Sequence, residues 1–274
     1  FAAAVLAKND PDAVFAVLTA DHIIEPDDVF RASIDKGFRL VEDDPSRLVT
    51  FSIKPTHPAT GFGYVERGEP IRVEGAGDGC YTVARFVEKP DFDRATEYLK
   101  SGRFGWNSGM FVFSARTFLD CLEKFVPESA KGLKKIADAW GTPDQKKVLD
   151  EEYPKLPKIS VDYAVMEPAS NDDSVTICGV EMPLRWLDVG SWPSYGETLE
   201  PDPLGNRTSG SGETVLVDSR HNLVVTDGDK AHTVALLGCE GLIVVHTPEA
   251  TLVMPSHCAQ ELKKLHAELR DGIK

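Results

Sequence analysis

The protein has 274 residues, of which 42% are hydrophobic and 27% are charged, and its formal net charge at pH 7 is −14. A chain of this length and composition buries a sizeable core, which excludes an intrinsically disordered protein. The strong negative charge argues against binding to nucleic acid or to an anionic membrane surface, because both carry the same sign of charge.

The first part of the chain alternates between helix and strand signals. Residues 1–13 are typical of the last turns of an Ala-rich helix followed by a loop, and because Phe1 opens in mid-pattern we expect the natural protein to begin earlier. The apolar run 13–19 predicts a strand buried on both faces. A helix is predicted over 26–41 and a strand over 48–53. This strand-helix-strand order is typical of a βαβ unit, which predicts a parallel sheet.

Shorter elements follow. The Gly- and Pro-rich segment 56–79 predicts a loop and a hairpin. Hydrophobic patterns predict strands over 81–87, 107–113, 174–180 and 184–188, and helices over 91–99, 118–139 and 160–166. Pro127 predicts a break in the long helix, and Ser160 is the expected N-cap of the last one.

The composition changes in the segment 201–212, where Pro, Gly and Ser dominate. We place a domain boundary there, with a first domain over 1–202 and a second over 203–274. Short β runs separated by turn signals follow, which predicts a small all-β domain such as a solenoid of short coils. The pattern predicts a final helix over 259–270, with its leucines on one face.

The cysteine count and the absence of long apolar runs indicate the compartment. The five cysteines are an odd number without a C-x-x-C pair, which argues against a disulfide scaffold or a zinc cluster. No apolar run reaches the ~18 residues that a membrane helix needs, and no signal peptide is visible. We therefore expect a cytoplasmic protein without a membrane partner.

Two aspartates follow predicted strand ends. Asp21 comes just after the first strand, and Asp188 follows a short apolar run and precedes Gly190. Ligands bind at the carboxyl ends of strands in open α/β sheets, and carboxylates there suit a hard cation such as Mg²⁺. Asp21 and Asp188 are therefore candidate metal ligands. The alternative for each is an aspartate that stabilises a turn.

Glu88 and Lys89 end another predicted strand. A glutamate accepts hydrogen bonds from sugar hydroxyls, and a lysine meets a phosphate as a point charge. Successive strand residues face opposite sides, so both reach one ligand only if the backbone is distorted there. The alternative is a solvated surface ion pair, which is the commoner fate of such a dipeptide.

Two further motifs carry groups that suit a ligand. In TGFGYV, Gly61 and Gly63 let backbone amides approach a ligand, although most such loops are simply turns. In WNSGMFVF, Asn107 and Ser108 interrupt an apolar strand. These polar groups need partners, which are either a bound sugar or internal backbone groups.

The order of these motifs resembles the mannose-1-phosphate guanylyltransferase family. The matching blocks are TADHII, KPTHPATGFGYV, FVEKPD, WNSGMFVF, SVDYAVME and DVGSW. The last two blocks distinguish this group from general sugar nucleotidyltransferases, and the resemblance covers nearly the whole chain. It implies an α/β fold, with a Rossmann-like nucleotidyltransferase domain followed by a small left-handed β-helix-like domain.

The resemblance also implies the site. It assigns the catalytic roles to Asp21, Asp188 and Lys89, with the two aspartates holding Mg²⁺. It assigns the binding of the sugar hydroxyls and of the phosphate to Glu88 and Lys89. The further substrate-binding candidates are Gly63, Tyr64, Asn107, Ser108, Gly109 and Asp162. Lys158, which lies just before the last predicted helix of the first domain, is added from its position as a second phosphate contact.

The implied reaction is attack by the phosphate oxygen of mannose 1-phosphate on the α-phosphorus of GTP, which gives GDP-mannose and pyrophosphate. The family opens with a G-G-x-G-T-R loop that cradles the triphosphate, and its bifunctional members end in an isomerase domain; neither lies in this sequence. The activity of the 274 residues alone therefore stays open. The alternatives are a catalytically silent sugar-nucleotide-binding subunit and a transferase for another sugar phosphate and nucleotide. A homodimer through the β domain is a further hypothesis.

Overall fold

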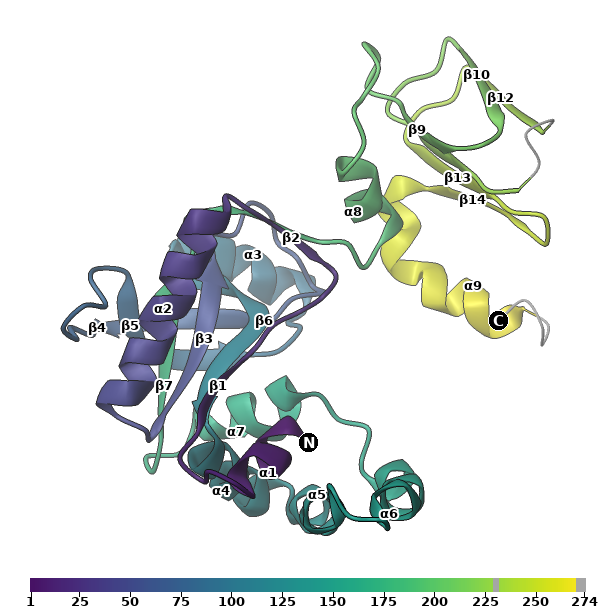
Figure 1. Cartoon of the computed structure of the whole chain (residues 1–274). Helices are drawn as coiled ribbons and strands as arrows, with labels where there is room; N and C mark the ends of the chain where they lie inside the picture. The colour runs from purple at the N-terminus through teal and green to yellow at the C-terminus, as the bar shows by residue number, and fades with distance from the viewer. Residues whose placement is uncertain (229–231, 270–274) are drawn as a thin grey trace. The chain divides into compact units, whose positions relative to one another are not determined.

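The computed structural model describes residues 1–228 and 232–269. The chain divides into two compact units, each of which is described by itself (Figure 1). Unit 1 consists of Phe1–Ala20 and Ile24–Trp186, and unit 2 of Asp21–Ile23 and Leu187–Lys274. The expected domain boundary between residues 202 and 203 stays a prediction.

Helices and strands alternate in the chain up to residue 188. The strands are β1 (Val14–Val17), β2 (His22–Glu25), β3 (Arg47–Ile53), β4 (Tyr64–Pro70), β5 (Cys80–Val87), β6 (Phe104–Ser114), β7 (Thr176–Glu181) and β8 (Arg185–Asp188). The helices are α1 (Ala2–Ala7), α2 (Asp27–Asp43), α3 (Phe92–Ser101), α4 (Ala115–Phe125), α5 (Pro127–Ala139), α6 (Gln145–Glu152) and α7 (Glu167–Ala169). A 3₁₀ turn covers Tyr153–Lys155, and a π-helical segment covers Asp162–Met166.

Six strands form the central sheet of unit 1, in the order β1-β6-β3-β7-β5-β4. The β3–β7 pair is parallel, whereas β6 runs antiparallel to both β1 and β3 and lies between them. The two strands of the predicted βαβ unit, β1 and β3, therefore run in the same direction but are not neighbours, and the sheet is mixed rather than wholly parallel because β6 lies between them. The expectation of a strand buried on both faces is wrong. Among the described strands, β1 lies at the edge of the sheet and is only partly buried.

The sheet separates two hydrophobic cores, since successive side chains of a strand point to opposite faces. Leu48 and Phe111 contribute to one core, while their chain neighbours Val49 and Val112 contribute to the other. Helices α4 and α5 and the π-helical segment pack on the first core. Helix α2 packs on the second, lying along the sheet as Figure 1 shows. This α/β/α layering confirms the predicted fold class.

Most predicted elements of unit 1 are confirmed. Helix α2 begins after Pro26, and the predicted helix over 118–139 is divided before Pro127 into α4 and α5. Helix α3 has Asp91 as its N-cap, whose carboxylate accepts a hydrogen bond from the Arg94 N–H at 2.8 Å. The helix expected over 160–166 differs in kind. Its first turn is closed by the Ala164 N–H donating to the Ser160 carbonyl at 2.9 Å, and a π-helical turn follows.

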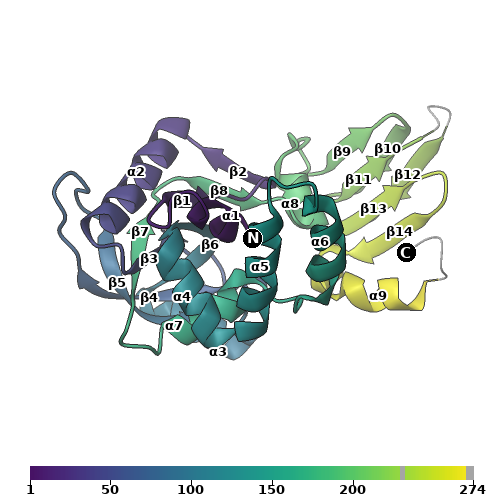
Figure 2. The ribbon, with the colours of Figure 1, turned by 60° about the horizontal axis from the view of Figure 1, so that its bottom comes forward.

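Unit 2 is made of short coils of β structure, which confirms the predicted small all-β domain (Figure 2). After residue 188 the elements are α8 (Trp192–Glu197), β9 (Arg207–Gly210), β10 (Glu213–Val217), β11 (Leu223–Thr226), β12 (Thr233–Leu237), β13 (Leu242–His246), β14 (Thr251–Pro255), a 3₁₀ helix (Ser256–Glu261) and α9 (Leu262–Glu268). Strand β9 lies in the segment 201–212, where the composition predicted a domain boundary. Of the helix predicted over 259–270, α9 is the α-helical part, and Arg270 lies outside the described residues.

Parallel pairing stacks the coils of unit 2. Strands β9, β11 and β13 pair in parallel, as do β10 and β12, and β14 closes the stack antiparallel to β13. Two buried asparagines link successive coils: the Asn222 carboxamide donates to Asn206 Oδ1 and to the Cys239 carbonyl, both at 3.0 Å. Within the described residues, no helix is long and apolar enough to cross a membrane.

Candidate functional site

Glu88 and Lys89 meet at the end of β5. Lys89 has a backbone φ of +46°, in the left-handed region that non-glycine residues rarely adopt. Such a backbone distortion was expected if the side chains of Glu88 and Lys89 were to reach one ligand. Lys89 Nζ lies 3.2 Å from Glu88 Oε1. Strained backbone of this kind is concentrated at ligand sites, so the observation favours a binding role for the pair over a surface ion pair.

The Glu88 carboxylate is held out of water with one oxygen unused. Its side chain is 6% exposed, and its Oε2 atom is buried without a hydrogen-bond partner among the described residues. Burial raises the pKa of Glu88, and the nearby Asp162 carboxylate raises it further, against the lowering effect of Lys89. A Cβ atom on Gly63 would lie 2.4 Å from Glu88 Oε2. The absence of a side chain at Gly63 therefore allows the Glu88 carboxylate to keep this position.

Strand β6 carries a bulge at the NSGM part of its motif. Thr50 of β3 pairs with Phe111, but Ser52 pairs with Asn107, so residues 108–110 of β6 stand opposite Phe51 alone, an excess of two residues. Gly109 in this bulge has a φ of +70°, which a glycine adopts without strain. Bulges re-aim side chains and are common beside active sites. Here the bulge sets the direction of Asn107.

The Asn107 carboxamide is bonded at both of its ends. Its Oδ1 accepts hydrogen bonds from Thr50 Oγ1 at 2.7 Å and from the Gly109 N–H at 3.3 Å. Its Nδ2 donates to Asp162 Oδ1 at 2.8 Å. Asp162 is presented by the π-helical turn, a local irregularity that often marks functional positions. These bonds connect β3, β6 and the π-helical segment around one polar group.

Five of the predicted substrate-binding residues are thus brought together in unit 1. This group, called the Glu88 cluster below, consists of Gly63, Glu88, Lys89, Asn107 and Asp162. It joins three acceptor or donor side chains, one ammonium group and a glycine. Such a mixture suits a ligand that carries both hydroxyls and a phosphate.

The remaining predicted contacts have other surroundings. The Tyr64 side chain is fully buried in the core, and its hydroxyl donates to the Ala59 carbonyl at 2.9 Å. The Ser108 hydroxyl is also buried and accepts the N–H of Met110 at 3.3 Å, within the bulge. Gly109 contributes through its backbone, as described above. The structure therefore gives Tyr64 and Ser108 structural roles, and their substrate contacts stay predictions.

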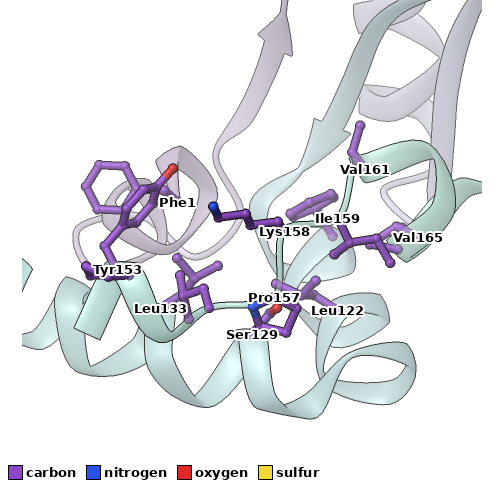
Figure 3. Close-up of a pocket in the computed structure, with 14 residues that line it drawn as sticks. Phe1, Leu122, Ser129, Leu133, Tyr153, Pro157, Lys158, Ile159, Val161 and Val165 are labelled. Atoms are coloured by element: carbon purple, nitrogen blue, oxygen red, sulfur yellow. The ribbon is translucent and has the colours of Figure 1, made fainter. Parts of the chain in front are cut away.

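Lys158 lies at a separate cavity of unit 1, with a volume of about 370 Å³. Figure 3 shows its side chain extending to the same side of the cavity as Phe1 and Tyr153. The other lining residues are mostly apolar and come from α4, α5, the 3₁₀ turn and the following segment, among them Leu122, Leu133, Leu156, Ile159 and Val165. This lining does not suit a phosphate, so the role predicted for Lys158 gains no support from the geometry.

The two candidate metal ligands lie together in unit 2. His22 Nε2 is 3.9 Å from an oxygen of Asp21 and 3.9 Å from an oxygen of Asp188. A backbone hydrogen bond also connects the two segments that carry Asp21 and Asp188, since the Val189 N–H donates to the Asp21 carbonyl at 3.1 Å. The Gly190 N–H donates to Asp188 Oδ1 at 3.0 Å and orients that carboxylate. Burial lowers the pKa of His22, outweighing the two carboxylates, which raise it.

The donor set of Asp21 and Asp188 suits a hard divalent cation. Mg²⁺ is usually bound by one or two carboxylates together with substrate phosphates and water, which matches a pair of carboxylates. In the part of the chain that the structure describes, no group of three or more His, Cys, Asp or Glu side chains is arranged to hold a metal ion. A closed, all-protein metal site is therefore not seen among those residues.

The sequence interpretation did not single out Thr50 or His22. Thr50 is a polar residue within the apolar run LVTFSI, and His22 stands next to Asp21 in TADHII. Thr50 could have been identified as a polar residue in a buried strand, because a buried polar group needs a hydrogen-bond partner. Its partner, Asn107, lies in another strand, and the antiparallel pairing of β3 with β6 was not predicted.

Comparison with known proteins agrees with this arrangement. The nucleotidyl transferase family model matches residues 1–202, and the MannoseP isomerase/GMP-like β-helix domain model matches residues 212–269. A mannose-1-phosphate guanylyltransferase of Escherichia coli is 38% identical over 94% of this chain, and the xanthan biosynthesis protein XanB of Xanthomonas campestris is 36% identical over 97%. The chain spans about half of each, 52% and 53% of their lengths.

The solved structures give the same result. The crystal structure described as mannose-1-phosphate geranyltransferase from Thermus thermophilus matches with a TM-score of 0.76 and 28% identity, covering 97% of this chain and 72% of that one. A structure described as mannose-6-phosphate isomerase from Helicobacter pylori matches with a TM-score of 0.53 and 30% identity, covering 68% of each chain. The family model, the sequence relatives and the fold agree, and the chain belongs to the nucleotidyl transferase family.

Proposed function

We propose that the protein transfers GMP from GTP to mannose 1-phosphate, giving GDP-mannose and pyrophosphate. The observation that carries the proposal is the buried, unpaired Glu88 Oε2 beside Gly63, with the Lys89 ammonium on the same carboxylate. An acceptor and a cation side by side suit a phosphorylated sugar. The identity of 35–38% to relatives named mannose-1-phosphate guanylyltransferase supports the choice of substrates.

In this proposal the Glu88 cluster binds the sugar phosphate. Glu88 accepts a hydrogen bond from a sugar hydroxyl, which satisfies an oxygen that is otherwise buried without a partner. Lys89, whose side chain is half exposed, offsets the charge of the phosphate. The nucleophile is a phosphate oxygen that is already ionised, so the protein has little proton transfer to perform. Alignment and charge neutralisation are its main contributions.

Asp21 and Asp188 would hold the metal ion, which we propose to be Mg²⁺. Nucleotidyltransferases generally use a divalent metal, and the two carboxylates have the hard oxygen donors that Mg²⁺ prefers. When bound, the ion supplies positive charge to the phosphates of the nucleotide. That contribution is needed in a protein of net charge −14 that must bind two polyanions.

Replacement of the aspartates tests the metal assignment. Asp21→Asn and Asp188→Asn keep the size of each side chain but remove its charge, so pyrophosphate release should fall by about 100-fold or more. Asp27→Asn, at an exposed aspartate on α2, is a matched control that should keep wild-type turnover. Wild-type turnover in both test variants would show that these residues do not hold the metal.

A homodimer through unit 2 is a second proposal. The β10–β12 sheet has an apolar outer face, on which Val215, Val217 and Leu237 are 41%, 48% and 74% exposed, and Val217 pairs directly with Leu237. Such a face favours association. Sedimentation should give the mass of a dimer, and Leu237→Lys should shift it to a monomer. A monomeric mass for the unchanged protein would reject the dimer.

The cytoplasmic location also stays a proposal. Its support is that all five cysteines are free thiols and that three of them, Cys80, Cys121 and Cys178, are buried. Burial raises the pKa of the Cys178 thiol to about 12, which makes it unreactive toward disulfide exchange. A protein with only free thiols suits a reducing compartment. Cell fractionation tests the location directly.

A further inference from the structure

We propose that Thr50 is a positioning residue that fixes the Asn107 carboxamide, and through it the hydrogen-bonding pattern of the Glu88 cluster. This inference rests on the proposed function, since it concerns how the same cluster recognises a sugar hydroxyl. Thr50 lies on β3, is fully buried, and donates its hydroxyl hydrogen to Asn107 Oδ1 at 2.7 Å.

The surroundings of Asn107 permit one orientation of its carboxamide. With Oδ1 toward β3, that oxygen accepts from Thr50 and from the Gly109 N–H, while Nδ2 donates to the Asp162 carboxylate. In the reversed orientation, Oδ1 would face the oxygen of Asp162, and Nδ2 would face the N–H of Gly109. One contact would then bring two acceptors together, and the other would bring two donors together. Thr50 is the only one of these three partners that reaches the carboxamide from β3, on the side away from Asp162.

This orientation places a donor and an acceptor on the same side of Gly63. A Cβ atom placed on Gly63 would lie 3.4 Å from Asn107 Nδ2 and 2.4 Å from Glu88 Oε2. Nδ2 has two hydrogens, of which one is used on Asp162. The other is available to a ligand, and Glu88 Oε2 is an acceptor without a partner among the described residues.

A hydroxyl group is the ligand group that both donates and accepts. A hydroxyl that reaches these two groups would donate to Glu88 Oε2 and accept from Asn107 Nδ2. If the carboxamide turned, two acceptors would face the same hydroxyl, and only one of them could be satisfied. The Thr50 hydroxyl, together with Asp162 and the Gly109 N–H, therefore holds the carboxamide in the orientation in which the cluster offers a matched donor and acceptor.

The test is calorimetric binding of mannose 1-phosphate to the unchanged protein, to Thr50→Val and to Thr50→Ser. Valine has the shape of threonine without the hydroxyl, so Thr50→Val should weaken binding about tenfold, equivalent to ~1.4 kcal/mol. Serine keeps the hydroxyl, so Thr50→Ser should bind nearly as tightly as the unchanged protein. The matched control is Tyr81→Phe, which removes another buried hydrogen bond to β3, the 2.6 Å bond to Ser52 Oγ, and should leave the affinity unchanged.

A double-mutant comparison separates positioning from a general structural effect. If Thr50 acts through Asn107, then Thr50→Val should weaken binding in the unchanged protein but cause no further loss when added to Asn107→Ala. Equal losses in both backgrounds, or equal affinities of Thr50→Val and the unchanged protein, would overturn the inference. Failure of the unchanged protein to bind mannose 1-phosphate would instead reject the sugar site of the proposed function.

Discussion

Gly63 acts through the side chain that it lacks. The nearest atoms to a Cβ at this position belong to Glu88 and Asn107, at 2.4 and 3.2 Å, and both side chains are held by other contacts. Neither can move aside without losing a buried hydrogen bond or ion pair. The proposed sugar site therefore rests on a glycine, an unpaired carboxylate oxygen and an ammonium group.

Alanine at position 63 tests this arrangement. In Gly63→Ala, the methyl group should displace Glu88 Oε2, the proposed acceptor for a sugar hydroxyl, and weaken the binding of mannose 1-phosphate by about tenfold or more. Gly196→Ala is a suitable control, because its Cβ would meet its nearest neighbour, Leu223, at an ordinary 3.4 Å. Calorimetry measures both, and unchanged affinity in Gly63→Ala would contradict the placement of the sugar.

The second prediction concerns pH. Burial is the main cause that raises the pKa of Glu88 in the folded state, and the Asp162 carboxylate is the second. The folded protein therefore holds the proton of the Glu88 carboxyl group more tightly than the unfolded chain does. The free energy of unfolding should therefore fall as the pH rises from the ordinary glutamate value of 4.5 through the raised pKa. Glu88→Gln lacks this titration. Urea unfolding at several pH values should show that the wild type loses stability relative to Glu88→Gln as the pH rises. If the free energies of unfolding of the two proteins changed in parallel with pH, the raised pKa would be contradicted.

At the scale of elements, the bulge in β6 connects the sheet to the site. It occupies residues 108–110, and Gly109 enters the left-handed region there. A Cβ at Gly109 would meet only Thr19, at 3.8 Å, so space does not restrict this position. Glycine is therefore favoured at position 109 because of the positive φ of the backbone and not because of a lack of space.

The third prediction tests that distinction. Gly109→Ala should lower the free energy of unfolding by about 1–2 kcal/mol, because alanine is strained in the left-handed region. Gly109→Asn should cost less, since asparagine tolerates that conformation better. Urea unfolding measures both changes. Equal losses for alanine and asparagine would indicate crowding rather than backbone strain.

Local elements were predictable from the sequence because their signals are local. Pro26, Asp91 and Pro127 mark helix starts that the structure confirms. The order of strands in the sheet was not predictable in the same way, because it depends on which distant apolar strands pair. The π-helical turn at Asp162 was also missed, since apolar spacing alone predicts an ordinary helix there.

At the scale of the whole molecule, two units carry the two groups of candidate residues. The Glu88 cluster lies in unit 1, and Asp21 and Asp188 lie in unit 2. The sequence motifs identified the members of both groups. Their hydrogen bonds, the unused oxygen of Glu88 and the role of Thr50 depend on side chains from separate strands, and only the folded structure supplies them.

The most direct test of the proposed function is pyrophosphate release from GTP and mannose 1-phosphate in the presence of Mg²⁺, using a form of the protein that includes any residues encoded ahead of Phe1. We expect one GDP-mannose for each pyrophosphate, with loss of both products when Mg²⁺ is chelated. UTP and glucose 1-phosphate are tested in parallel. Absence of turnover with every pair, while mannose 1-phosphate still binds, would contradict the transferase and leave a protein that binds sugar phosphate without catalysis.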